Sequence, residues 1–230
     1  NAFANTAITS ITIPGSVESI GAGAFEGCAS LEEIVIPDSV TSVGENAFKD
    51  CTGLKTITVP ISLEITGDMF EGCEDLEKVI FTKGTGTGHN YTEETYKNTP
   101  WSASSAANLE IEISGGIEHI GDYTFYGCDN LTAADLPASV TSIGDNAFAG
   151  TGITEIAIPG SVESIGEGAF ADTSLSTIVL KEGLKTIGDN AFANTAITSI
   201  TIPGSVTEIG DGAFKDSEYL ADITLNEGLE

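Results

Sequence analysis

Four cysteines are the residues of this 230-residue chain whose type most readily supports covalent or metal chemistry. Each lies three residues after a phenylalanine, in a slot that elsewhere holds a hydroxyl residue: the cysteines are Cys28, Cys51, Cys73 and Cys128, and the others are Thr6, Thr151, Thr173, Thr195 and Ser217. A zinc site needs closely spaced ligand pairs, which this spacing does not supply. Stacked at this interval, the cysteines would reach disulfide distance, but their Cβ bonds would be parallel. We therefore expect a buried row of free small residues.

A row of acidic residues follows a recurrent glycine and could bind cations: Glu45, Asp68, Asp122, Asp145, Glu167, Asp189 and Asp211. One interpretation is a series of calcium sites along one edge of the molecule. The other is a preference for acidic residues near the start of a helical turn, repeated by duplication. Calcium-binding repeats gather several oxygen ligands in one short loop, whereas here each repeat supplies a single carboxylate. We expect no cofactor, and calcium is kept as the weaker alternative.

Other motifs give no indication of catalysis. His89 and His119 have no second histidine beside them to complete a metal set, and no serine lies in a nucleophile-elbow sequence. The stretch Gly84–Gly88 alternates glycine and threonine but lacks the Gly-Lys-[Ser/Thr] of a phosphate loop. We expect no enzymatic activity.

The elements that would position these residues repeat along the whole chain. Residues 1–17 read NAFANTAITSITIPGSV, and residues 190–206 have the same sequence. Nine of the ten phenylalanines recur at intervals of 22 or 23 residues, apart from one skip between Phe70 and Phe125. Such a unit cannot bury its apolar residues alone, but stacked units bury them in a continuous core. The period therefore predicts a solenoid of about ten coils.

Each repeat divides into short elements. The stretch LEEIVI, residues 31–36, alternates with apolar Ile34 and Ile36, as a half-buried strand does, and Pro37 then ends it. The stretch GENAF, residues 44–48, is typical of a tight corner that leads into a helical turn. We expect ten strands in one parallel sheet, with strands about 4.8 Å apart.

The motif IPDSVTSVGENAFKDCTGLKTITVP, residues 36–60, with its flanking repeats, resembles the BspA-like (Treponema-type) leucine-rich repeats of bacterial surface proteins. The resemblance covers essentially the whole chain. It implies a leucine-rich-repeat solenoid with its parallel sheet on the concave side and short strands or helical turns on the convex side. It also implies a secreted or surface-anchored adhesin whose partners are host or neighbouring-cell proteins such as fibronectin or fibrinogen. Both ends lack a polar cap, so residues 1–230 are expected to be one solenoid from a longer array.

One coil departs from the period. Phe81 and Ile113 occupy equivalent strand positions but lie 32 residues apart, which leaves room for one irregular coil with about ten extra residues at 82–108. It contains the only tryptophan, Trp101, and two tyrosines, Tyr91 and Tyr96. These residue types are enriched at interface hot spots. They form either an exposed binding loop or packing that replaces the missing Ala-Phe pair, and the sequence leaves both open.

The outward residues of the expected sheet are mostly small or β-branched, which suits a sheet surface for its own sake. Three acidic residues interrupt this row close in sequence to the irregular coil. They are Glu110, Glu112 and Asp135, and we call them the acidic step. Together with Tyr91, Tyr96 and Trp101 these residues are the candidate binding site, since an acidic patch suits a basic protein surface.

The net charge of the chain limits the kinds of molecule that it can bind. The formal net charge is −27, and all eight basic residues are lysines. Such a surface repels phosphate backbones and lacks the bidentate contacts of arginine, so we expect no nucleic-acid partner. No apolar run reaches the roughly 20 residues that span a bilayer. The predicted function is that of an extracellular or cell-surface adhesion module, expected to be a monomer, and the alternative is a structural spacer without a ligand.

Overall fold

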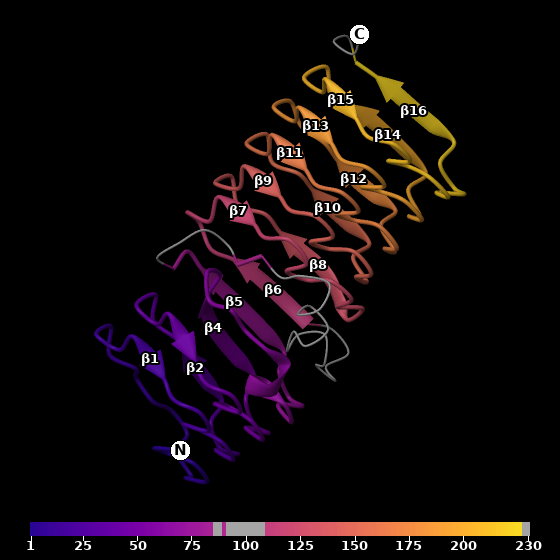
Figure 1. The fold of residues 1–230 in the computed structure, drawn as a ribbon. Coiled ribbons are helices and arrows are strands. Elements are labelled where there is room, and N and C mark those ends of the chain that lie inside the picture. Colours follow the sequence, from indigo (N-terminus) through magenta and orange to yellow (C-terminus); the bar gives the residue numbers. More distant parts are fainter. Residues whose placement is uncertain (85–88, 91–108, 227–230) are drawn as a thin grey trace.

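A computed structural model describes residues 1–84, 89–90 and 109–226 of the chain as a stack of coils along one axis, with the two termini at opposite ends (Figure 1). Two rows of parallel strands run along different sides of the stack. The row of longer strands comprises β2 (Glu33–Val35), β4 (Thr56–Pro60), β5 (Lys78–Thr82), β6 (Leu109–Ile113), β8 (Leu131–Asp135), β10 (Glu155–Ala157), β12 (Thr177–Val179), β14 (Ser199–Ile202) and β16 (Asp222–Leu225).

The second row consists of two-residue strands, five of which follow a corner that contains proline. They are β1 (Ser19–Ile20), β3 (Ser42–Val43), β7 (His119–Ile120), β9 (Ser142–Ile143), β11 (Ser164–Ile165), β13 (Thr186–Ile187) and β15 (Glu208–Ile209). Each pairs in register with its counterpart one coil away, for example Ser142 with Ser164. The solenoid architecture, with strands on both sides of one core, is therefore as the repeat period predicts.

The longer row differs from one uninterrupted sheet of ten strands. Among the described residues it contains nine strands, which pair in groups β2-β4-β5-β6-β8, β10-β12 and β14-β16, and the segment around Ile13 forms no strand. The first break has a local cause. The register shifts between Leu109 and Ile111 where β6 pairs with β8, and the hydrogen bond from Thr154 N–H to the Thr132 carbonyl across the break is stretched to 3.4 Å.

The expected helical turn after the recurrent glycine is wrong for most coils. Among the described residues only η1 (Gly67–Phe70), a 3₁₀-helix, has helical geometry. In other coils a residue of the corner adopts a left-handed backbone, as Asn46 does with φ of 56° and Asn146 with φ of 53°. Asparagine tolerates this conformation. A residue in the left-handed region stops the backbone from continuing as a helix, so the corner stays tight.

The core is a column of phenylalanine rings flanked by aliphatic residues. Phe148 and Phe170 stack with centroids 5.2 Å apart, and Phe170 and Phe192 with centroids 5.5 Å apart; all three rings are fully buried. The column changes at the irregular coil, where Phe81 meets Phe125 edge-on at 5.5 Å. Each coil thus buries its apolar residues only against its neighbours, which makes the sheet surface a rigid platform.

Candidate protein-binding face

The acidic step predicted from the sequence lies on the outward side of β6 and β8. Glu112 and Asp135 pair directly across the two strands, and Glu110 faces Lys78 of β5. Parallel strands point alternate residues to the same face, so these side chains share one surface. The structure brings three of the six predicted binding residues together. The other three, Tyr91, Tyr96 and Trp101, lie outside the described residues.

A lysine neutralises part of this acidic step. The Lys78 ammonium lies 2.8 Å from a Glu112 carboxylate oxygen and 2.9 Å from one of Glu110. Hydrogen bonds to Glu112 and then to Glu110 raise the pKa of the Lys78 ammonium above its ordinary value. Exposed pairs of this kind contribute little stability. Lys78 pairs with Glu110 and Glu112. Asp135 is therefore the member of the acidic step that has no lysine partner among the described residues.

Next to Asp135 the sheet surface is hollowed. A shallow depression of about 220 Å³ crosses β8, β10 and β12 and is lined by Ala133, Ala134, Asp135, Glu155, Ile156, Ala157, Thr177 and Val179. Two outward alanines, Ala133 of β8 and Ala157 of β10, line it between longer side chains. The inward Ala134 of β8, paired with Ile111 of β6, lies at the same place as the register shift. We did not predict this depression from the sequence. The pair Ala133-Ala134, in a row of otherwise mostly β-branched residues, is the pattern that could have indicated it.

The depression combines charge with exposed apolar surface. Asp135 and Glu155 contribute carboxylates, and Val179 at its far side is 49% exposed. A floor of alanine methyl groups accepts an aliphatic stem, and carboxylates at the rim attract a cationic head. The arrangement therefore suits a lysine or arginine side chain of another protein.

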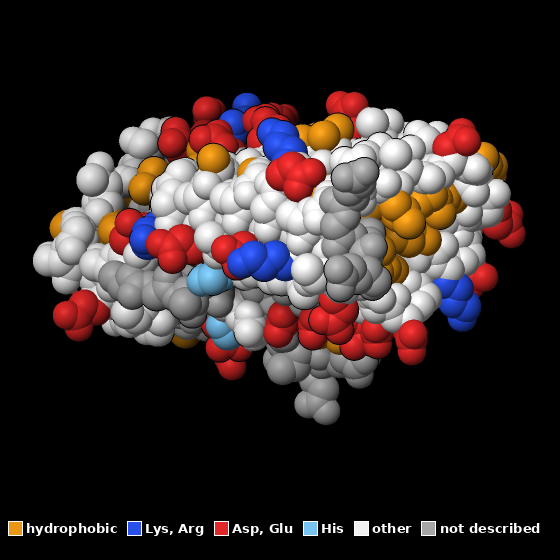
Figure 2. All heavy atoms as spheres, turned by 90° about the horizontal axis from the view of Figure 1, so that it is seen from above, with side chains coloured by type: hydrophobic (Ala, Val, Ile, Leu, Met, Phe, Trp, Pro, Cys, Tyr) orange, Lys and Arg blue, Asp and Glu red, His pale blue; other side chains and the backbone are white. Residues whose placement is uncertain are grey.

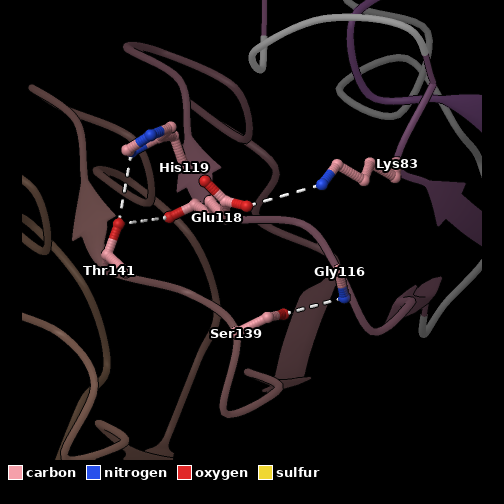
Figure 3. A network of polar contacts seen from close by, with 6 residues as sticks. All are labelled: Lys83, Gly116, Glu118, His119, Ser139 and Thr141. Carbon is pink, nitrogen blue, oxygen red and sulfur yellow. Dashed lines mark hydrogen bonds and ion pairs between the residues drawn. The ribbon is translucent and has the colours of Figure 1, made fainter.

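The side of the short strands carries a separate polar network (Figure 3). The Lys83 ammonium is 3.4 Å from a Glu118 carboxylate oxygen, and the Thr141 hydroxyl donates to the Glu118 carbonyl at 3.0 Å. His119 Nδ1 lies 2.8 Å from the Ser142 hydroxyl, in register across β7 and β9. His119 thus occupies a position that holds serine in neighbouring coils and bonds within the ladder.

His89 and Asn90 occupy the place of the glycine and acidic residue of a regular corner. The Asn90 side-chain oxygen accepts a hydrogen bond from the Asp122 N–H at 3.1 Å. Asp122 does the same for the Asp145 N–H at 2.9 Å, and Asp145 for the Glu167 N–H at 2.8 Å. At Asp122, Asp145 and Asp189 the acidic row therefore links one coil to the next through a backbone N–H group. Within the described residues no group of three or more His, Cys, Asp or Glu side chains is placed to hold a metal ion.

The cysteine slot is a buried row of free thiols, as expected. The Cys51 thiol donates to the Phe25 carbonyl at 3.2 Å, and the Cys73 thiol to the Phe48 carbonyl at 3.2 Å. Burial raises the pKa of the Cys128 thiol well above its ordinary value. The slot is therefore structural, with its polar groups satisfied by main-chain carbonyls.

A stack of short parallel strands around a phenylalanine column, with a shallow acidic depression on a rigid face, defines a repeat protein of the leucine-rich class. The chain belongs to the family described as "BspA type Leucine rich repeat region", whose model matches six copies over residues 1–100 and 101–221. This family supports a protein-interaction repeat module, and its repeats are typically non-catalytic. No curated protein matches the chain.

Solved structures share the fold. A leucine-rich repeat protein from Bacteroides ovatus matches 93% of this chain and 66% of its own, with a TM-score of 0.53 and 23% sequence identity. A leucine-rich cell surface protein from Faecalibacterium prausnitzii matches 94% of this chain and 68% of its own, with a TM-score of 0.40 and 23% identity. The pneumococcal vaccine antigen PcpA matches 96% and 62%, with a TM-score of 0.44 and 20% identity. The chain thus spans about two thirds of the length of these proteins. In the described part of the chain no helix is long and apolar enough to cross a membrane.

Proposed function

We propose that the chain is a non-catalytic, extracellular protein-binding module that contacts its partner through the outward face of β6, β8, β10 and β12. The observation that carries this proposal is the depression beside Asp135 and Glu155, where a local loss of volume interrupts an otherwise even sheet surface. Family membership supports a protein-interaction role, and the formal net charge of −27 favours partners with basic surfaces.

The partner is a protein that presents a lysine or arginine flanked by apolar residues. The cationic head would lie between Asp135 and Glu155, and the aliphatic stem over Ala157. Val179 would contact the apolar neighbour. Host or neighbouring-cell proteins such as fibronectin and fibrinogen are the first candidates, on the family resemblance noted from the sequence. Long-range attraction would raise the association rate more than it slows dissociation, so binding should weaken with added salt.

A structural spacer is the second candidate function. It is favoured by the rest of the outward face, where β-branched residues such as Thr58 and Thr201 suit the sheet itself. A spacer would bind neither fibronectin nor fibrinogen through the depression.

The test is binding of the chain to immobilised fibronectin and fibrinogen at about 150 mM salt, near physiological ionic strength. An Asp135→Lys, Glu155→Lys double variant should bind roughly tenfold more weakly, because both carboxylates of the rim become repulsive. The matched control is the pair Glu18→Lys and Glu208→Lys, which makes the same change of four charge units beside the short strands β1 and β15. Equal affinity of the double variant and the control would reject the face.

A Trp101→Ala variant separates this face from the irregular coil. Binding lost in Trp101→Ala but kept in the double variant would place the site on the coil. Binding to neither protein by the unmodified chain would favour the spacer.

A further inference from the structure

The depression on the outward face reaches the main chain of the sheet. Its lining includes Ala134 of β8 and Ile156 of β10, whose side chains are buried on the inward side. Because successive residues of a strand point to opposite faces, an inward residue lines an outward depression through its backbone atoms. The outward residues beside them, Ala133 and Ala157, have side chains too short to cover this backbone. The floor of the depression therefore offers polar main-chain groups as well as methyl groups.

The strands β8 and β10 lie in consecutive coils but no ladder joins them. At the end of β10 the Ile158 N–H donates to the Val179 carbonyl of the following coil at 2.9 Å. The equivalent bond one coil earlier would join the Leu136 N–H to the Ala157 carbonyl, and it is missing although both residues belong to the described part of the chain. The Ala157 carbonyl thus has no main-chain donor from β8, and Ala157 lines the depression.

The same two coils are also unconnected at the corner that follows these strands. The Ser139 hydroxyl oxygen accepts a hydrogen bond from the Gly116 N–H of the preceding coil at 3.0 Å, and Ser205 accepts one from the Gly183 N–H at 3.0 Å. Ser161 has the equivalent position in the coil of β10, but its buried hydroxyl oxygen has no hydrogen-bond partner among the described residues. The gap between the coils therefore extends beyond the strands, and it leaves the carbonyl at the depression available to a ligand.

The net charge of the chain attracts cations of every kind. Acidic side chains lie across the surface seen in Figure 2 with few lysines among them, and the sequence has 35 acidic residues against eight lysines. This field attracts lysine and arginine side chains alike. A preference between the two must come from short-range contacts inside the depression.

Those contacts suit an ammonium group better than a guanidinium group. Asp135 and Glu155 supply carboxylate oxygens at the rim, and the Ala157 carbonyl supplies a third acceptor at the floor. A lysine ammonium is compact and carries three N–H donors that point in different directions, so it can bond to all three acceptors. The guanidinium of arginine holds its donors in one plane, which matches a single carboxylate but not three acceptors at different depths.

We propose that the depression selects lysine over arginine on the partner protein. The ammonium donates to the Asp135 and Glu155 carboxylates and to the Ala157 carbonyl, and the lysine stem lies over the alanine methyl groups. This inference rests on the proposed binding face and names the side chain that the face recognises. Because arginine gives up at least one of the three hydrogen bonds, it should bind about fivefold more weakly.

The test is a titration of the ¹³C,¹⁵N-labelled chain with two peptides of equal charge, acetyl-Leu-Lys-Leu-amide and acetyl-Leu-Arg-Leu-amide, followed by NMR. The lysine peptide should shift the amide resonances of Asp135 and Glu155 and move the carbonyl ¹³C resonance of Ala157 downfield. The arginine peptide should shift the same amides with about fivefold lower affinity and leave that carbonyl unchanged. Equal affinities, or a preference for arginine, would overturn the selectivity and leave the proposed face standing. If neither peptide shifts these resonances, the face itself is wrong and the inference fails with it.

A substitution tests the three-acceptor arrangement. Glu155→Gln removes one carboxylate, so the affinity for the lysine peptide should fall to that for the arginine peptide, which retains its contact with Asp135. Glu33→Gln is the matched control, because Glu33 is an exposed outward glutamate on β2, away from the depression. The control should keep the lysine preference. A Glu155→Gln chain that still prefers lysine by the same factor would contradict the arrangement.

Discussion

The residue three places after each core phenylalanine determines how a buried carbonyl is satisfied, and its identity varies with coil length. In three of the four Cys-x-x-Leu coils the thiol reaches the phenylalanine carbonyl of the preceding coil, as Cys73 reaches Phe48 O. Ser217, also followed by two residues and leucine, donates to Phe192 O in the same way at 3.0 Å. Cys128, which follows the irregular coil, instead lies 4.0 Å from the Tyr126 carbonyl of its own coil. Where the sequence is one residue shorter, threonine donates within its own coil, as Thr151 does to Phe148 O at 2.8 Å. The slot thus accommodates coils of two lengths without leaving a buried carbonyl unsatisfied.

The Cys128 and Cys73 thiols should be unreactive in the folded chain. Burial raises the pKa of the Cys128 thiol, and hydrogen bonding to Cys51 together with burial raises that of Cys73, whereas the same hydrogen bond lowers the pKa of its partner Cys51. The nucleophile is the thiolate, so both groups should react slowly with a thiol reagent at pH 8. All four cysteines should react at once when the chain is unfolded. Rapid labelling of Cys128 in the native protein would contradict its burial.

The same shifts set a pH dependence of stability. A thiol whose folded pKa lies above its unfolded value stabilises the native state fully at pH below the unfolded value. That contribution is lost as pH rises above the pKa of the thiol in the unfolded chain, because the thiol can then ionise in the unfolded chain but not in the folded one. The free energy of unfolding should therefore decline above about pH 9. A Cys128→Ser, Cys73→Ser variant should show a smaller alkaline decline in urea titrations.

At the scale of elements, the alternation of apolar residues predicted the strands because one face of each is buried. Ile34 of β2 and Ile57 of β4 are buried and paired, as the pattern requires. Two features depended on three-dimensional context. The left-handed backbone at Asn46 replaces the expected helical turn, and periodicity carries no information about the sign of φ. The depression depends on which strands lie side by side, because the outward Ala133 of β8 and Ala157 of β10 line it together although they belong to different coils.

The phenylalanine column should transmit damage only to adjacent coils. Replacing Phe148, which stacks on Phe170 and contacts Phe125, by alanine should cost about 3–5 kcal/mol of unfolding free energy. Hydrogen exchange should accelerate first in β8, β10 and the short strands beside them, since each coil contacts only its neighbours. An equal loss of protection in β2 and β16 would show that the stack unfolds as one cooperative unit instead.

At the scale of the whole molecule, the net charge affects the stability of the folded stack. Four lysines form ion pairs with glutamates of a neighbouring coil: Lys49 with Glu71, Lys78 with Glu110, Lys83 with Glu118, and Lys185 with Glu163. The chain has 35 acidic residues against eight lysines, so the net charge is −27 with the lysines of these pairs already counted. The remaining acidic residues repel one another along the stack, so the folded state is stabilised by screening.

Melting temperature should therefore rise with ionic strength. Sodium chloride should raise it, and calcium chloride at equal ionic strength should raise it by about the same amount if the acidic row binds no specific cation. The measurement is a thermal melt followed by circular dichroism. A distinctly larger shift with calcium, reversed by a chelator, would instead support calcium sites along the row that includes Asp145 and Asp189.

The most direct test of the proposed binding face is carboxylate labelling of the chain with and without bound fibrinogen. Asp135 and Glu155 should be labelled in the free chain and protected in the complex, because the partner's basic side chain would cover them. Glu208, on the short-strand side, should be labelled equally in both. Binding that leaves the labelling of Asp135 and Glu155 unchanged would contradict the assignment of protein recognition to this face.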